Sequence, residues 1–266
     1  MRPYTALTIA GSDSGGGAGI QADIKTMEEW QVYGMSVLTS LTAQNTMGVQ
    51  EVHHVPVPFL TAQLKSIEED LPVDAIKTGM ISSKEAARTV GEWIGARRKP
   101  YVCDPVMVTA SGHPLMEEET REALSEYLFP HADVVTPNIP EAETLLGMSI
   151  KTEADMEEAA GLFVEKLGSR GALIKGGHLE GEAVDVLYDG EIMRTYREAR
   201  IKTDNTHGTG CTYASAIAAN LARGRTLPAA VEKSKHFITE AIRHSFDLGS
   251  GSGPTNHWAG RIGEIK

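Results

Sequence analysis

Short apolar runs and amphipathic stretches alternate along most of the chain. The apolar runs are rich in β-branched residues and are bounded by Gly, Pro or Asp, which is typical of buried strands. They cover residues 6–10, 36–42, 75–78, 101–106, 133–136 and 172–175. The stretches between them repeat apolar residues at helical spacing and predict helices over residues 20–30, 59–69, 84–97, 118–128 and 153–167. This alternation predicts an α/β fold, with a mostly parallel sheet and helices on both faces.

One segment breaks the alternation. Residues 184–188 and 192–196 flank Asp189-Gly190, which indicates a small antiparallel hairpin. Two further helices are predicted over 212–223 and 227–246. Because we find no internal repeat and no shift in composition, we expect a single domain over residues 1–266, with a loop and loose end from about residue 249.

Composition narrows the classes of function. The chain has 266 residues, 41% hydrophobic and 23% charged, which excludes a disordered, collagenous or coiled-coil protein. A formal net charge of −11 argues against binding nucleic acid or anionic membranes, so an anionic ligand needs a local site. The two cysteines lie far apart, and we see neither a secretory signal nor an apolar run of membrane-spanning length. We therefore expect a cytoplasmic protein.

Several known motifs are missing from the sequence. It has no GxxxxGK[ST] segment, which excludes a P-loop NTPase. Glycines cluster after the first predicted strand but do not form GxGxxG, so dinucleotide binding loses its main support. HExxH, GxSxG and the protein-kinase HRD and DFG motifs are also absent.

A glycine-rich segment, GSDSGGGAG at residues 11–19, follows the first predicted strand and ends where a helix begins. Glycine permits positive φ angles and lets the backbone approach a ligand closely. Open α/β sheets bind ligands at the carboxyl ends of their strands. We therefore interpret this segment as a ligand-binding loop; the alternative is a flexible connection with a high glycine content.

A second segment, DNTHGTGCT at residues 204–212, leads into an Ala-rich helix. Gly208 and Gly210 allow a tight turn, and the free N–H groups of the helix start then face that turn. Such donors, together with the positive end of the helix dipole, form an anion hole. Cys211 falls at the first helical positions, where the pKa of a thiol tends to be lowered. The alternative is a small buried cysteine in a core helix.

Oxygen ligands follow two later strands. Asp104 ends the fourth predicted strand, while Asn138 and Glu141 are spaced to face one site from the start of a helix. Mg²⁺ prefers a few oxygen ligands plus water and phosphate, so Glu141 and Asp104 are candidate metal ligands. The alternative for Asn138 and Glu141 is a helix cap with an acid in the first turn.

Two strand-end residues are ambiguous when taken alone. Lys175 ends the sixth predicted strand, where it either meets a phosphate or extends to solvent. Gln44 ends the second predicted strand and is either a ligand-binding amide or a polar loop residue.

Taken together, these segments closely resemble the hydroxymethylpyrimidine/phosphomethylpyrimidine kinases of thiamine biosynthesis. The resemblance runs from about residue 6 to 254 and rests on residues 7–19, 21–23, 42–46, 77–80, 104–107, 136–141, 175–178 and 205–212. It implies a three-layer ribokinase-like fold. It also implies ATP- and Mg²⁺-dependent phosphorylation of 4-amino-5-hydroxymethyl-2-methylpyrimidine and then of its monophosphate, in an enzyme that is commonly a homodimer.

The resemblance also implies roles for individual residues. Gln44 would face the 4-amino group and neighbouring ring nitrogen of the substrate, because one amide supplies both a donor and an acceptor. Gly11 and Asp23 would complete the polar contacts to the pyrimidine, and Met80 and Val106 would cover the ring. The γ-phosphate would lie over residues 208–211, with Mg²⁺ at Glu141 and Asp104. The remaining nucleotide contacts would come from Asn138, Lys175, Gly177, Asp204, Thr206 and Thr209.

Cys211 marks a departure from the wider ribokinase pattern, which usually places an aspartate there as general base. The pyrimidine-kinase branch shares the cysteine. A thiolate could accept the hydroxymethyl proton, or the anion hole and the metal could suffice, because phosphoryl transfer depends mostly on positioning and charge stabilisation.

Two other functions compete with this interpretation. A pyridoxine/pyridoxal kinase is the nearest, but a pyridoxine site would gain little from the amide of Gln44, because pyridoxine has a ring hydroxyl and no exocyclic amine. A non-catalytic nucleotide-binding module is the second. The joint presence of Cys211, Glu141, Asp104 and Gln44 argues against it.

Overall fold

The computed structural model describes residues 2–107, 118–177, 179 and 181–261. Its described strands form one sheet of nine, in the order β3-β2-β1-β4-β5-β6-β7-β8-β9. The strands are β1 Tyr4–Asp13, β2 Val32–Asn45, β3 Gly48–His54, β4 Ala75–Thr78, β5 Tyr101–Cys103, β6 Val134–Val135, β7 Ala172–Lys175, β8 Ala183–Tyr188 and β9 Met193–Glu198. Neighbours from β2 to β7 pair in parallel, while β3, β8 and β9 are antiparallel to theirs. The predicted fold class is confirmed.

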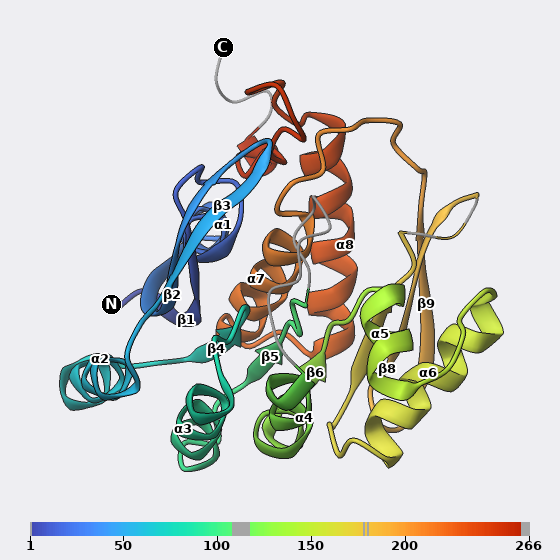
Figure 1. The fold of residues 1–266 in the computed structure, drawn as a ribbon. Helices are drawn as coiled ribbons and strands as arrows, with labels where there is room; N and C mark the ends of the chain where they lie inside the picture. The colour runs from blue at the N-terminus through green and yellow to red at the C-terminus, as the bar shows by residue number, and fades with distance from the viewer. Residues whose placement is uncertain (1, 108–117, 178, 180, 262–266) are drawn as a thin grey trace.

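Helices cover both faces of this sheet (Figure 1). The α-helices are α1 Gly19–Glu29, α2 Val57–Asp70, α3 Lys84–Gly95, α4 Glu118–Tyr127, α5 Ile139–Leu146, α6 Glu153–Glu165, α7 Thr209–Ala222 and α8 Leu227–Arg243. Buried side chains of α2 to α6 pack on one face, and those of α1, α7 and α8 on the other. The Ala-rich sequence of α7 lets this helix lie against the strands with twelve of its residues buried. No helix among the described residues is long and apolar enough to cross a membrane.

The parallel register brings distant motifs to one edge of the sheet. β1 ends at Asp13, β2 at Asn45 and β7 at Lys175, and the segments that follow β5 and β6 begin with Asp104 and Thr136. All of these points are carboxyl ends of parallel strands, which is where open α/β sheets bind ligands.

The structure adds one strand that the sequence analysis did not predict and corrects one expectation. Residues 48–54, which contain many polar residues, form the edge strand β3, because Ser40 to Asn45 on β2 pair with them in antiparallel register. The expected loose end from residue 249 is packed up to residue 261. Thr255 is fully buried, and the N–H of Asn256 donates to the Ala241 carbonyl over 2.9 Å. The segment therefore packs against the rest of the domain.

Candidate active site

A cavity of about 530 Å³ opens at the carboxyl ends of the parallel strands, within the size range of small-molecule sites. Most of the residues predicted to act on substrate, nucleotide or metal line it. They are Gly11, Gln44, Met80, Asp104, Val106, Asn138, Glu141, Lys175, Gly177, Thr206, Gly208, Thr209, Gly210 and Cys211. Asp23 and Asp204 do not line it. His178, the last residue of one motif, lies outside the described residues.

Asp13 organises the glycine-rich segment. Its carboxylate accepts hydrogen bonds from the N–H groups of Gly15 (2.8 Å), Gly17 (3.1 Å) and Ala18 (2.8 Å). The same carboxylate lies 2.8 Å from Nε2 of His207. Burial alone would raise the pKa of Asp13, but the bonds from His207 and the backbone hold that pKa below its usual value. Sequence reasoning noticed this motif but assigned neither Asp13 nor His207.

The turn that the sequence predicts as an anion site, which we call the phosphate turn (residues 208–211), is present at the start of α7. Gly208 is the N-cap residue and has φ +79°, and a Cβ there would lie only 1.8 Å from the Gly17 carbonyl oxygen. Glycine is therefore required at this position. Thr209 N–H donates to Thr206, and the helical pattern gives the amides of Gly210 and Cys211 no acceptor within α7. Those two amides form a donor pair for an anion.

The environment of Cys211 corrects one prediction. Its side chain lines the cavity but is only 9% exposed, and burial raises the pKa of its thiol to about 11. The helix start and the nearby Lys77 favour a thiolate, but desolvation outweighs them. Sequence position alone predicted the opposite direction. The thiol is therefore protonated at neutral pH when the cavity is empty.

Asp23 lies beneath the cavity. It is fully buried, and its carboxylate accepts hydrogen bonds from Lys77 (2.9 and 3.0 Å), Thr8 (2.5 Å) and Ser215 (2.6 Å). The expected direct contact with substrate is therefore wrong, because the oxygens of Asp23 are already used inside the fold. The ion pair instead joins β1, β4, α1 and α7 directly below the phosphate turn.

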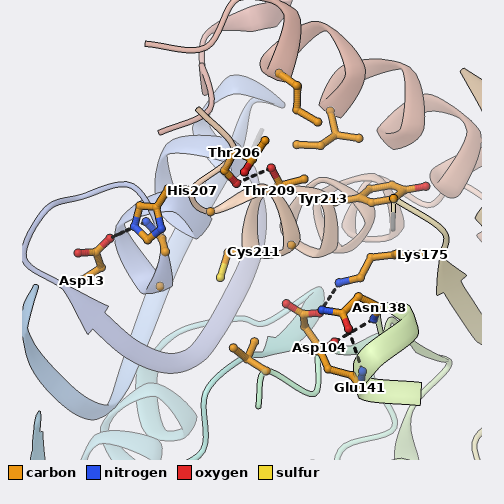
Figure 2. Close-up of a pocket in the computed structure, with 18 of the residues that line it drawn as sticks. Asp13, Asp104, Asn138, Glu141, Lys175, Thr206, His207, Thr209, Cys211 and Tyr213 are labelled. Atoms are coloured by element: carbon orange, nitrogen blue, oxygen red, sulfur yellow. Dashed lines mark hydrogen bonds and ion pairs between the residues drawn. The ribbon is translucent and has the colours of Figure 1, made fainter. Parts of the chain in front are cut away.

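A cluster of charged side chains lines the wall opposite the Asp13–His207 pair, and Cys211 lies between the two (Figure 2). Lys175 donates to Asp104 over 2.9 Å, and Thr136 donates to the same carboxylate over 3.0 Å. Lys175 therefore forms an ion pair at the cavity instead of extending freely to solvent. A Cβ on Gly210 would lie 3.4 Å from the Lys175 ammonium and 3.6 Å from Asp104, so the phosphate turn faces this pair.

Glu141 is the most perturbed acid of the cavity. Its side chain is almost fully buried, and desolvation, reinforced by the nearby Asp104, raises its pKa to about 7 despite attraction to Lys175. Its oxygens accept from the N–H of Asn138 (2.9 Å) and of Met107 (3.5 Å). Asn138 in turn accepts from the N–H of Glu141, which completes a capping box at the start of α5. The helix-cap interpretation is therefore correct, and the same two residues also line the cavity.

These carboxylates fit a magnesium ion. Among the described residues, no group of three or more His, Cys, Asp or Glu side chains could hold a metal without help. Mg²⁺, however, commonly takes one or two carboxylates and completes its shell with water and substrate phosphate. Burial is the main cause of the raised pKa of Glu141, and the negative charge of Asp104 raises it further while Lys175 lowers it, so a cation beside these two carboxylates would favour the ionised form of Glu141.

Gln44 enters the cavity from the end of β2. Its Oε1 accepts a hydrogen bond from Thr42 over 3.2 Å, and its Nε2 lies 3.4 Å from Nε2 of His207. Its backbone N–H and carbonyl are both bonded to the Ser14 hydroxyl at 2.8 Å. The amide is therefore held at the cavity wall with both its donor and its acceptor side available for exchange with a ligand.

A second buried ion pair, missed from the sequence, lies at the far end of the cavity. Lys235 on α8 donates to Asp185 on β8 over 2.7 Å, and Asp185 also accepts from the N–H of Gly176 over 3.1 Å. Asp185 and Lys235 line the cavity together with Ile238. No motif marks them, because they meet only through the packing of α8 on the sheet.

Comparison with known proteins agrees with this geometry. Residues 13–256 match the family model described as phosphomethylpyrimidine kinase. A hydroxymethylpyrimidine/phosphomethylpyrimidine kinase of Streptomyces coelicolor is 48% identical over 260 residues, which is 97% of this chain and 96% of that protein.

Solved structures agree as well. The ADP complex of Bacillus subtilis pyridoxal kinase is 42% identical, with a TM-score of 0.91 over 98% of this chain and 100% of that one. A phosphomethylpyrimidine kinase from Clostridium difficile is 44% identical, with a TM-score of 0.80 over 90% of this chain and 99% of that one. The match over nearly the whole chain, on a fold that carries the same motifs around one cavity, shows that this chain belongs to the phosphomethylpyrimidine kinase family.

Proposed function

We propose that the protein transfers the γ-phosphoryl group of ATP to the hydroxymethyl group of 4-amino-5-hydroxymethyl-2-methylpyrimidine, and then phosphorylates the monophosphate to the diphosphate. One observation carries the proposal: a single cavity holds the Gln44 amide, suited to an aminopyrimidine edge, and the anion-binding turn at residues 208–211. A single domain would hold the entire site. Membership of the kinase family and the ADP complex of a close structural relative support the use of ATP.

The acceptor would be bound by the wall that carries Gln44. The amide Oε1 would accept from the 4-amino group, and Nε2 would donate to the adjacent ring nitrogen. Gly11, Met80 and Val106 line the same cavity and would enclose the ring. Asp23 would act only indirectly, through the buried pair beneath the turn.

The nucleotide phosphates would lie along the opposite wall. The amides of Gly210 and Cys211 would bind the γ-phosphate at the helix start. Lys175 would add positive charge. Burial alone would lower the pKa of its ammonium group, but attraction to Asp104 and Glu141 raises that pKa and keeps Lys175 protonated. Gly177, Asn138, Thr206 and Thr209 line the cavity and would complete the nucleotide site. Asp204 would support this site from outside the cavity, through its backbone carbonyl.

Asp104 and Glu141 would hold Mg²⁺ beside the phosphates. When bound, the ion would neutralise charge on the transferring phosphoryl group. In the free enzyme, Glu141 is partly protonated near neutral pH, so it must lose its proton to become a full ligand.

Cys211 would face the reacting hydroxyl and accept its proton. Its thiol must first ionise: burial raises its pKa, and the Lys77 ammonium and the N–H of Gly19 lower that pKa only in part. The thiolate is therefore a scarce but strong base at neutral pH.

A substrate panel tests the proposed function. Purified protein is incubated with ATP and Mg²⁺ and with the pyrimidine alcohol, its monophosphate or pyridoxal, and each reaction is scored for ADP release and product mass. We expect ADP release with the first two and the pyrimidine diphosphate as final product. ATP binding without transfer to any acceptor would instead indicate a nucleotide-binding module.

Pyridoxal phosphorylation is a second candidate activity. The observation that favours it is the likeness to the Bacillus subtilis pyridoxal kinase, which is 42% identical and superimposes over nearly the whole chain. The same panel separates the two activities, because a dedicated pyridoxal kinase would give pyridoxal phosphate at a higher kcat/KM than the pyrimidine phosphate.

A cytoplasmic homodimer is the form that we propose for the enzyme. Both cysteines are free thiols, as expected in a reducing compartment. The hairpin at this edge of the sheet exposes Leu41 on β2 and Met47 in the turn between β2 and β3, and exposed sheet edges with apolar side chains favour association. Sedimentation analysis of the wild type and of Met47→Glu tests this assembly, with a monomeric variant as the expected result.

A further inference from the structure

A C-terminal segment joins the hairpin tip beside Gln44 to the segment that leads into the phosphate turn. We call residues 249–255 the clasp. The N–H of Ser252 donates to the carbonyl of Thr46 over 3.2 Å, and the N–H of Gly251 donates to the Thr46 hydroxyl over 3.2 Å. Thr46 lies in the turn between β2 and β3, two residues after Gln44, and Figure 1 shows the C-terminal segment beside this hairpin tip.

The other side of the clasp is bonded to the approach to the phosphate turn. The N–H of Gly253 donates to the side chain of Asn205 over 2.9 Å. His207 donates its N–H to the Gly253 carbonyl and accepts from the N–H of Thr255, both over 3.1 Å. Gly208, the N-cap of α7, follows His207 directly, so the clasp ends one residue from the anion site.

The clasp approaches both partners as closely as a backbone can. A Cβ on Gly251 would lie 2.0 Å from the Thr46 carbonyl oxygen, and one on Gly253 would lie 2.6 Å from Oδ1 of Asn205. No side chain fits at such distances without moving the backbone. Gly161 in α6 is different, because a Cβ there would meet nothing within 4 Å. The clasp glycines are therefore required by contact with the two walls.

We propose that the clasp is a positioning element, which fixes the separation between the wall that carries Gln44 and the turn that binds phosphate. Two side-chain contacts also link the Gln44 side to the segment before the phosphate turn. Nε2 of Gln44 lies 3.4 Å from Nε2 of His207, and His207 pairs with Asp13. Neither Thr46 nor the clasp lines the cavity, so the clasp would act through the walls. Phosphoryl transfer requires the reacting atoms about 3–3.5 Å apart, and a misplacement of about 1 Å can cost about 10²-fold in rate.

The inference rests on the proposed function and is tested with Gly251→Ala. The added methyl group forces the hairpin tip away from the clasp and leaves the nucleotide wall in place. We expect kcat/KM for the acceptor to fall about tenfold or more. The affinity for ADP, measured by calorimetry, should stay within twofold. Gly161→Ala is the matched control and should leave both quantities unchanged.

Thr46→Val is a gentler second variant, for use if Gly251→Ala folds poorly. It removes the hydroxyl that accepts from Gly251 and keeps the volume, so kcat/KM should fall about two- to tenfold. Thr46→Ser keeps the hydroxyl and should restore the wild-type value. An acceptor kcat/KM within twofold of wild type in well-folded Gly251→Ala or Thr46→Val, or an equal loss of ADP affinity, would overturn the proposal.

The failure of the proposed function has a different signature. In that case the wild-type protein itself would not phosphorylate the pyrimidine, and the clasp would be tested with pyridoxal as acceptor. If neither acceptor reacts, the clasp is tested by comparing the hydrogen-exchange rates of the backbone amides of residues 42–49 in Gly251→Ala and in wild type. Faster exchange in Gly251→Ala than in wild type would support the clasp, and equal exchange would contradict it.

Discussion

The two walls of the cavity differ in the chemistry of the side chains that line them. The wall with Asp104, Glu141 and Lys175 consists of buried charges at short range, and burial and neighbouring charges shift the pKa values of Glu141 and Lys175. The wall with Gln44 consists of a neutral amide on a hairpin, held through the backbone by Ser14 and by the clasp at Thr46. The Asp13–His207 pair lies beside Gln44, but the group suited to an aminopyrimidine on this side is the neutral amide.

This difference suggests a division of labour. Phosphoryl transfer needs charges placed where charge develops, and the buried wall holds ionisable groups in fixed positions for this purpose. Recognition of the acceptor needs a pattern of hydrogen bonds that can differ between related enzymes. A pyridoxal kinase and a phosphomethylpyrimidine kinase are both close structural relatives of this chain. We therefore expect the neutral wall to decide which acceptor is used.

The largest effect is expected at Cys211, which lies between the walls. Cys211→Ala should lower kcat by about 10²–10⁴-fold with an unchanged melting temperature, because loss of a general base typically costs this much. The matched control is Cys103→Ala, since burial also raises the pKa of Cys103 to about 11 but that thiol does not line the cavity. A near-native kcat in Cys211→Ala would reduce the thiol to a packing role.

The pH profile sharpens this prediction. With a pKa of about 11, the thiolate fraction of Cys211 is about 10⁻⁴ at pH 7 and rises tenfold per pH unit. Log kcat/KM for the acceptor, which reports the free enzyme, should therefore increase with a slope of about one between about pH 8 and 10, above the pKa of Glu141. A flat profile would mean that the hydroxyl proton leaves by another route.

The charged wall is tested next, through the metal. Glu141→Gln keeps the capping box but removes a charged oxygen ligand, so the Mg²⁺ concentration for half-maximal rate should rise about tenfold, with little change in KM for the pyrimidine. Glu143→Gln on the same helix is the control, because Glu143 does not line the cavity. An unchanged Mg²⁺ dependence in Glu141→Gln would leave Glu141 as a capping residue alone.

The smallest effect concerns stability. The pKa of Glu141 is about 7 in the folded protein against an ordinary value of 4.5, so burial favours its neutral form. The corresponding stability is present below about pH 4.5 and is lost as pH rises through 7. In metal-free buffer, Glu141→Gln should raise the melting temperature by a few degrees at pH 8, about 2–4 °C per kcal/mol, and by less at pH 5. An equal change at both pH values would contradict this assignment.

The sequence was informative wherever a motif is local. Strand ends at Asp104, Lys175 and Gln44 predicted one shared edge, because parallel strands align their carboxyl ends. The glycines of residues 208–210 predicted the anion turn, since backbone geometry is encoded in neighbouring residues. The residues predicted for the site therefore line the cavity, with the exception of Asp23 and Asp204.

Features that depend on distant packing were not predictable in this way. Asp23 belongs to a motif, yet its partners Lys77 and Ser215 lie 54 and 192 residues away, and only the fold reveals that they use its oxygens. The raised pKa of Cys211 depends on how deeply α7 is buried, which outweighs the effect of the helix start. The clasp combines glycine, serine and proline, a composition that equally fits a free tail.

The acceptor specificity of the Gln44→Met variant tests most directly whether the neutral wall selects the acceptor. The substitution keeps the approximate volume and removes both hydrogen-bonding groups, so the pyrimidine would bury an amine and a ring nitrogen without partners, at a cost of about 1–3 kcal/mol. We predict that kcat/KM for the pyrimidine alcohol falls by roughly tenfold to a hundredfold or more, that kcat/KM for pyridoxine falls much less, and that KM for ATP stays constant. An equal fall for both acceptors would contradict the account, because Gln44 would then maintain the shape of the cavity without selecting the substrate.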